Sequence, residues 1–415
     1  MPVQVPTTAT LPSDHQPGQL MALTIMTVVM VLTMTAWFSA SAVIPQLRDD
    51  WHLSTTEASF LTIAVQVGFV IGALVSATLN LSDVYPARTV LWLSALGAAL
   101  VNGLIVFADG PALALLLRFL TGLFLAGVYP VVLKIMSTWF QRGRGVALGV
   151  LVGGLTLGSA APHFVNGVGG LGWQQVILAT SALTLAGALL TLVAVRDGPF
   201  PFPRASFDPR QVGQVFANRG IRLASIGYFG HMWELYAMWA WFLAFFTDSL
   251  ASAGHMDVQR AAALGTFAVI GIGAVGCWLG GILGDHWGRT RTTAAAMALS
   301  GGSSILAGAV FGGPFVIVLI VGLVWGLTVV ADSAQFSTIV SELCDQLYVG
   351  TALTIQLAVG FTLTVVTIWL VPILRDSIGW EWTFAFLAPG PAVGIVAMLY
   401  LQRLPESRLI AGGRG

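Results

Sequence analysis

The stretch GGILGDHWGRTR, residues 280–291, decides how the rest of this sequence is interpreted. It places glycines, one acid and two arginines between two long apolar runs. A divergent copy, NLSDVYPARTV, lies about half a chain earlier at residues 80–90. A charged tight turn that recurs at this separation indicates a duplicated membrane protein, because internal repeats of whole helix bundles are common in such proteins.

The composition is that of a membrane protein. Hydrophobic residues make up 56% of the 415 residues and charged residues only 9%, whereas a soluble domain carries roughly 25% charged residues. The formal net charge is zero, which argues against a nucleic-acid partner. Two cysteines are too few for a disulfide framework, and no Cys/His cluster has the spacing of metal ligands. We therefore expect no metal and no cofactor.

The apolar runs predict an all-α membrane protein with about twelve spans, because a transmembrane helix needs about 20 largely apolar residues. We place the spans at 21–44, 55–80, 89–107, 112–136, 146–168, 174–195, 221–248, 260–284, 292–311, 315–340, 350–374 and 381–402. Residues 196–220, the longest polar interruption, predict a cytoplasmic linker between two six-helix bundles at 21–195 and 221–403. Residues 1–20 and 404–415 are predicted to be cytoplasmic tails, the first of them disordered.

The placement of basic residues predicts the orientation. With the N-terminus in the cytoplasm, 14 of the 18 lysines and arginines fall on the cytoplasmic side and three on the outer side, as the positive-inside rule requires. Trp51, Trp173, Trp380 and Trp382 then fall near outer helix ends, where interfacial rings gather. We expect a monomeric, multi-pass protein of the bacterial inner membrane, surrounded by lipid and with both termini cytoplasmic.

These features together resemble the major facilitator superfamily over about residues 20–403. The second-half loop is similar to the family's motif between its eighth and ninth helices at Gly284, Asp285, Gly288, Arg289 and Arg291. The first-half copy keeps Asp83 and Arg88 but has Asn80 and Pro86 where glycines are usual. The resemblance implies two pseudo-symmetric six-helix bundles that expose a central site to each side in turn.

The loop residues are candidate members of a cytoplasmic gate. A carboxylate such as Asp83, at the inner end of a span, can face the positive end of a neighbouring helix and nearby arginines. In the resembled family such contacts close the cytoplasmic side, and glycines permit the tight turn. The alternative is an ordinary loop whose positive charges only set the topology.

Glu234, in the middle of the span at 221–248, is the first candidate for substrate or proton coupling. An ionisable group at this depth costs several kcal/mol and normally faces a cavity or a partner. His231 lies three residues earlier on the same helical face, and a carboxylate beside an imidazole can exchange a proton near neutral pH. The alternatives are a static His–Glu pair, or a Glu234 that binds hydroxyl groups of a neighbouring helix.

Three further residues complete the predicted substrate and proton site. Asp332 lies on a polar stripe of the span at 315–340, where it either faces the pathway or forms a gate pair. Arg118 resembles the arginine of a family motif linked to proton coupling. It either needs a carboxylate or an anionic substrate at depth, or it extends to the outer interface. Trp37 either stacks on substrate or packs against other helices.

The sequence thus predicts a secondary active transporter that moves a small organic solute by alternating access, with protons as the coupling ion. The alternative is a transporter-like membrane sensor or scaffold that binds solute without turnover. We do not expect an enzyme, because the sequence has no nucleophile–base arrangement, metal motif or phosphate-binding loop. The identity of the solute, and the choice between symport and antiport, stay open because this fold serves many solutes.

Overall fold

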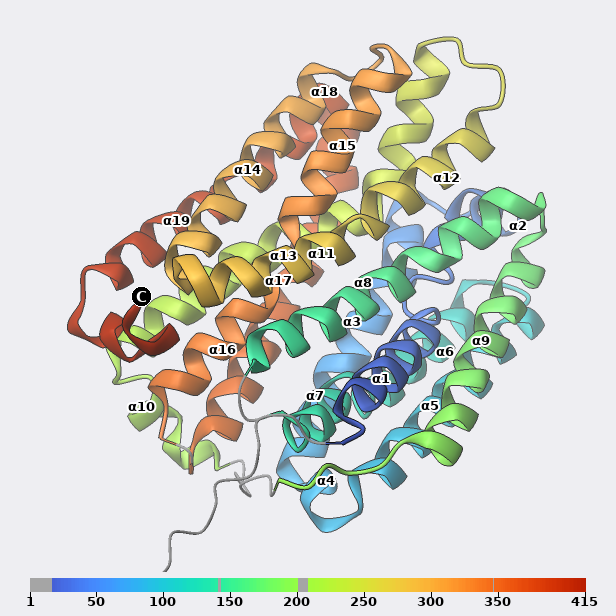
Figure 1. Cartoon of the computed structure of the whole chain (residues 1–415). Helices are drawn as coiled ribbons and strands as arrows, with labels where there is room; N and C mark the ends of the chain where they lie inside the picture. Colours follow the sequence, from blue (N-terminus) through green and yellow to red (C-terminus); the bar gives the residue numbers. More distant parts are fainter. Residues whose placement is uncertain (1–16, 141–142, 201–207, 346) are drawn as a thin grey trace, which may run out of the picture.

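The computed structural model describes residues 17–140, 143–200, 208–345 and 347–415, with only the backbone described at residues 82, 83, 144 and 169. The secondary structure of this described part is helical (Figure 1). It contains nine spans that are long and apolar enough to cross a membrane. Three more helices, α1, α11 and α14, pack among them, which is consistent with the twelve predicted spans. Most of the predicted disordered tail, residues 1–16, lies outside the described residues.

The first half contains six crossing segments, some of them built from two helices. They are α1 (Gln19–Met34) with α2 (Ile44–Trp51), α3 (Thr55–Thr78), α5 (Ala87–Gly103), α6 (Pro111–Leu125) with α7 (Tyr129–Ser137), α8 (Arg144–Gly169) and α9 (Trp173–Ala194). The short helix α4 (Leu81–Val84) connects α3 to α5, and α10 (Val212–Val215) lies between the halves.

The second half repeats this order. Its segments are α11 (Arg219–Ser252), α12 (Val258–Gly271) with α13 (Gly273–Trp287), α14 (Arg289–Ala309), α15 (Phe315–Val329) with α16 (Ser333–Leu343), α17 (Val349–Ile378) and α18 (Trp380–Thr383) with α19 (Pro389–Gln402). Figure 1 shows the blue-to-green first half and the yellow-to-red second half as two separate groups, with α8 running between them. The arginine-rich end of the bundle is the end at which Arg88, Arg289, Arg291 and Arg403 lie.

Several predicted continuous spans are interrupted in the structure. Three of the breaks lie at residues 35–40, 126–128 and 330–332. Pro130 follows the second break and occupies the first turn of α7, where its missing N–H is tolerated. An interrupted backbone inside a membrane is stable only where neighbouring groups satisfy its carbonyls and N–H groups. The sequence did not reveal these breaks, because the residues at the breaks are largely apolar and continue the apolar run of each span.

Glycines set the shortest helix contacts. A Cβ atom at Gly68 of α3 would lie 1.9 Å from the carbonyl oxygen of Phe119 in α6, and one at Gly149 of α8 would lie 2.7 Å from the carbonyl oxygen of Cys277 in α13. Small residues allow membrane helices to approach this closely, because close packing replaces the hydrophobic effect as the force between them. The α8–α13 contact joins the two halves, and so does the pair of rings Phe69 and Phe361, whose centroids are 4.6 Å apart.

The predicted C-terminal tail folds back onto the arginine-rich end. It forms the short helices η5 (Pro405–Leu409) and η6 (Ala411–Gly413). The N–H of Ala411 donates to Glu342 Oε2 at 3.1 Å, and the carbonyl of Gly415 accepts from the N–H of Thr290 at 3.3 Å. This tail therefore borders the end of the cavity described next.

Candidate functional site

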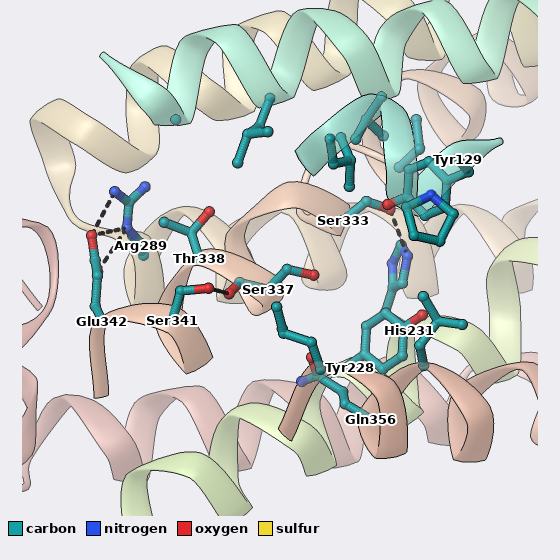
Figure 2. Close-up of a pocket in the computed structure, with 18 of the residues that line it drawn as sticks. Tyr129, Tyr228, His231, Arg289, Ser333, Ser337, Thr338, Ser341, Glu342 and Gln356 are labelled. Atoms are coloured by element: carbon teal, nitrogen blue, oxygen red, sulfur yellow. Dashed lines mark hydrogen bonds and ion pairs between the residues drawn. The ribbon is translucent and has the colours of Figure 1, made fainter. Parts of the chain in front are cut away.

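A cavity of about 1180 Å³ lies between the two halves and reaches the arginine-rich end. Its walls come from α7 and the first part of α8 on one side, and from α11, α16 and α17 on the other. In the close-up, Arg289 and Glu342 lie at one end, and His231 with Ser333 lies at the other (Figure 2). Ser337, Thr338 and Ser341 of α16 lie between these two pairs (Figure 2).

His231 lines the cavity and contacts residues at the start of α16 through both ring nitrogens. Its Nε2 is 2.7 Å from Ser333 Oγ, and its Nδ1 is 2.9 Å from Asp332 Oδ1. Asp332 immediately precedes α16 at the break in the tenth segment and is 1% exposed. The contact therefore joins α11 to a point where the backbone is already interrupted.

Glu234 hydrogen-bonds to residues of two other helices rather than to His231, whereas the sequence-based expectation placed the carboxylate beside the imidazole. Its Oε2 accepts a hydrogen bond from Ser300 Oγ at 2.8 Å, and its Oε1 accepts one from Trp325 Nε1 at 2.8 Å. Glu234 is 1% exposed and is not among the residues that line the cavity. The structure therefore matches the alternative in which a neighbouring helix's hydroxyl holds the carboxylate. Three residues advance a helix by less than one full turn, which is enough to point Glu234 at α14 and α15.

Among the residues that the structure describes, Arg118 neither pairs with a carboxylate nor lines the cavity. Its guanidinium donates to the carbonyl oxygens of Ala36, Trp37 and Leu61, to Ser39 Oγ and to Asn102 Oδ1. Because Ala36, Trp37 and Ser39 belong to the break at residues 35–40, Arg118 satisfies carbonyls that the interrupted helix leaves without partners. The side chain is fully buried, so it does not extend to the outer interface, and in place of a carboxylate it binds backbone, hydroxyl and amide oxygens.

Trp37 packs in an aromatic cluster at the closed end of the cavity instead of lining the cavity. Its ring lies 4.8 Å from Phe69, 5.9 Å from Tyr236 and 5.7 Å from Phe361, measured between centroids. Since Trp37 and Phe69 belong to the first half and Tyr236 and Phe361 to the second, this cluster joins the halves. Of the two sequence-based interpretations of Trp37, stacking on substrate and packing against other helices, the second describes its position in this conformation.

The second-half loop residues form a charged network at the arginine-rich end. Arg289 contacts Asp285 at 3.1 Å and Glu342 at 2.9 Å, and it donates to Gln335 Oε1 at 2.9 Å. Asp285 also faces the first turn of α8, because a Cβ at Gly145 would lie 2.7 Å from Asp285 Oδ1. A carboxylate beside a helix N-terminus is stabilised by the helix dipole, so this acid connects the two halves.

The remaining loop candidates make contacts or backbone turns within their own half. Gly288 has a φ of 102°, a conformation that glycine adopts readily, and a Cβ at Gly284 would lie 2.3 Å from Gln335 Oε1. With its amide oxygen turned toward Arg291, Gln402 accepts from Arg291 Nε at 2.6 Å. In the first-half copy, Arg88 donates to the carbonyl of Leu192. The side chain of Asp83 lies outside the described residues.

Several cavity residues were missed by the sequence interpretation. They are Tyr129, Tyr228, Ser333, Ser337, Glu342 and Gln356. Ser333, Ser337 and Ser341 follow one another at helical spacing in SAQFSTIVSEL, and residues four apart share a helix face. That signal was readable from the sequence. The tyrosines carried none, because a tyrosine in a span is as common in packing as in a cavity.

Comparisons with known proteins identify relatives. The sequence profile described as Major Facilitator Superfamily matches residues 26–254. The chain is 26% identical over 295 residues to the gallate transporter of Pseudomonas putida, with 62% of this chain and 64% of that protein covered. It is 32% identical over 177 residues to the galacturonate transporter of Dickeya chrysanthemi, with 41% and 48% covered. The matched region thus spans less than two thirds of each relative.

A solved structure shares the fold. A variant of the nucleoside transporter NupG superimposes with a TM-score of 0.69 at 14% sequence identity, and the alignment covers 92% of this chain and 99% of that one. At this identity the likeness concerns the arrangement of helices alone. The described helices therefore have the same general arrangement as in that transporter.

Proposed function

The chain belongs to the Major Facilitator Superfamily, and we propose that this integral multi-pass membrane protein is a proton-coupled secondary transporter of a small organic acid. One observation carries the proposal. The His231–Asp332 contact lies at the wall of a cavity that reaches one end of the protein. Solute and protons can therefore reach the same place from the same side.

The orientation follows from charge. We place the arginine-rich end in the cytoplasm of a bacterial inner membrane, because basic residues are retained on that side. The cavity is then open to the cytoplasm, and the aromatic cluster of Trp37, Phe69, Tyr236 and Phe361 closes the outer side. Alternating access requires the halves to separate at this cluster while they close at the network around Asp285 and Arg289.

Proton coupling is proposed to act through the backbone break before α16. A protonated His231 attracts the Asp332 carboxylate and holds α11 against the break, whereas a neutral His231 loses that attraction. In the described part, titratable groups near this pair include Glu234 of α11 and Cys277 of α13, which lie near Asp332, and Tyr228 of α11, whose ring centroid is 6.1 Å from that of His231. Glu234 already accepts two hydrogen bonds, so we assign the exchangeable proton to the His231–Asp332 pair.

The class of solute is proposed from two sources. The relatives named above are a gallate transporter and a galacturonate transporter, and both named solutes are carboxylic acids. Lys134 and His231 both line the cavity of this chain, and a cationic group is what an organic anion requires in a partly dry site. A monomer is sufficient for this mechanism, because the cavity lies between two halves of one chain.

The test is a flux screen with the full chain in proteoliposomes. Labelled carboxylic acids are offered under an imposed pH gradient, and empty liposomes serve as the control. We expect at least one acid to accumulate against its own gradient, and the sign of the effective pH gradient decides between symport and antiport. Saturable binding without flux would overturn transport and favour the sensor or scaffold alternative. Flux that ignores the pH gradient would overturn proton coupling alone.

A further inference from the structure

The deep end of the cavity has an aromatic wall. Tyr129 of α7, Tyr228, Tyr236 and Trp239 of α11, and Phe361 of α17 all line it. The ring of Tyr236 lies 5.5 Å from Trp239 and 5.0 Å from Phe361, measured between centroids. Rings at such separations leave faces and edges that a further ring can contact favourably.

Several polar donors on this wall have no hydrogen-bond partner among the residues that the structure describes. The Nε1 of Trp239 is buried without a hydrogen bond, although Trp239 lines the cavity and is 0% exposed. No hydrogen bond between the described residues involves the hydroxyl groups of Tyr129, Tyr228 or Tyr236. The tyrosines line the cavity, so their hydroxyl groups can donate to a solute with acceptor oxygens, whereas Trp239 Nε1 is shielded by the surrounding protein.

The charges are separated along the cavity. Asp285 and Glu342, the acids that line it, lie at the arginine-rich end and contact Arg289. Lys134 lies on α7 five residues after Tyr129, which is about 7.5 Å along the helix axis. His231 lies on the opposite wall. A ring against the tyrosines therefore leaves a carboxylate near Lys134 and His231 and away from Asp285 and Glu342.

From these observations we infer that the solute is an aromatic carboxylate, with its ring against Tyr228, Tyr236 and Trp239 and its carboxylate toward Lys134 and His231. The inference rests on the proposed function and narrows it. A sugar acid has the carboxylate and more hydroxyl groups, but it lacks the flat apolar face that an aromatic wall selects. We therefore expect the cavity to bind an aromatic acid such as gallate more tightly than a sugar acid such as galacturonate.

The first experiment uses matched probes with the purified full chain in detergent. Binding of benzoate is compared with cyclohexanecarboxylate, which removes aromaticity, and with benzamide, which removes charge. Trihydroxybenzoate and galacturonate complete the panel. We expect both aromatic acids to bind about three- to tenfold more tightly than cyclohexanecarboxylate and galacturonate, as expected for an added aromatic pair. We also expect weaker binding of benzamide.

The second experiment changes the wall. Trp239→Leu and Tyr228→Phe are compared with Trp233→Leu, a variant of the same helix whose tryptophan packs on Phe386 and does not line the cavity. We expect Trp239→Leu to erase the preference for benzoate over cyclohexanecarboxylate and Trp233→Leu to retain it. If Trp239→Leu fails to fold, Tyr228→Phe keeps the ring and should still weaken trihydroxybenzoate binding by about threefold.

The outcomes separate this inference from the proposed function. Transport of galacturonate or cyclohexanecarboxylate under a pH gradient, with equal or weaker binding of the aromatic acids, would overturn the aromatic assignment and leave proton-coupled transport standing. The absence of transport for every acid would instead contradict the proposed function. Tight binding of benzamide would show that charge is not recognised, and would also overturn the inference.

Discussion

The two halves each bury an ionisable site, and the two sites have opposite surroundings. In the first half, Arg118 donates to backbone carbonyls, a hydroxyl and an amide of its own half and does not line the cavity. In the second half, His231 and Asp332 meet beside the cavity, and His231 also contacts Ser333 on the cavity wall. Both sites are almost fully buried. Burial alone therefore does not separate a structural charge from one that can exchange a proton.

The two sites differ in whether the groups that contact each other can change their protonation state. Arg118 donates hydrogen bonds to groups that do not titrate, and these bonds satisfy carbonyl oxygens at a helix break. The His231–Asp332 contact involves two groups that can each gain or lose a proton, and one of them reaches the cavity. We therefore expect variants of Arg118 to affect folding first, and variants of Asp332 to affect coupling first.

The largest expected effect is on stability in the first half. Arg118→Ala leaves several buried oxygens without a donor, and we expect it to lower the free energy of unfolding by about 3–5 kcal/mol. The thermal denaturation of the purified protein measures this loss. Arg222→Ala, at an exposed arginine of α11, is the matched control. If the Arg118→Ala protein is stable but transports without pH dependence, Arg118 acts in proton coupling and not in folding, which contradicts this prediction.

The second prediction concerns coupling in the second half. Asp332→Asn removes the charge that His231 faces, and we expect accumulation driven by a pH gradient to fall by about 100-fold, the scale of a lost proton-transfer group. Exchange of solute across liposomes without a pH gradient should continue. Asp248→Asn, at an acid whose carboxylate accepts from Trp380 Nε1, is the control. Undiminished accumulation by Asp332→Asn would remove this pair from the mechanism.

A smaller effect is expected at Glu234. Glu234→Gln keeps one oxygen to accept from Trp325 Nε1, but its amide nitrogen can only donate, so the Ser300 hydroxyl must change from donor to acceptor and both bonds lose their charge. We expect a loss of about 1–3 kcal/mol in the free energy of unfolding, with the pH profile of transport unchanged. Melting curves and pH-dependent flux are measured on the same preparation. A shifted pH profile with unchanged stability would make Glu234 part of the coupling machinery.

The smallest effect is expected at the charged network of the arginine-rich end. Glu342→Gln weakens its contact with Arg289, and because the Glu342 side chain is 27% exposed, we expect a change of about 0.2–1 kcal/mol. The population of the cytoplasm-open state should shift by less than about fivefold, measured as distances between spin labels on α7 and α16. Asp376→Asn breaks the exposed pair with Arg375 and should leave these distances unchanged.

Much of the architecture was readable because it depends on local composition. The low charge, the apolar runs and the repeated loop predicted an all-helical membrane protein with two related halves. The sequence also placed Asp285 at a helix end and Asp332 and His231 within spans. It did not identify their partners, since a helical period gives the face of one helix but not the neighbour that this face meets. Glu234 shows the limit: its partners Ser300 and Trp325 come from α14 and α15.

The sequence by itself determined that this chain lies in a membrane as a duplicated set of helices, because hydrophobic length and charge placement act locally and need no knowledge of packing. The tertiary structure alone decided which buried charges reach the cavity. That choice depends on how the helices are rotated about their axes and where they break. Backbone carbonyls exposed by one break bind Arg118, whereas the break before α16 brings Asp332 to His231.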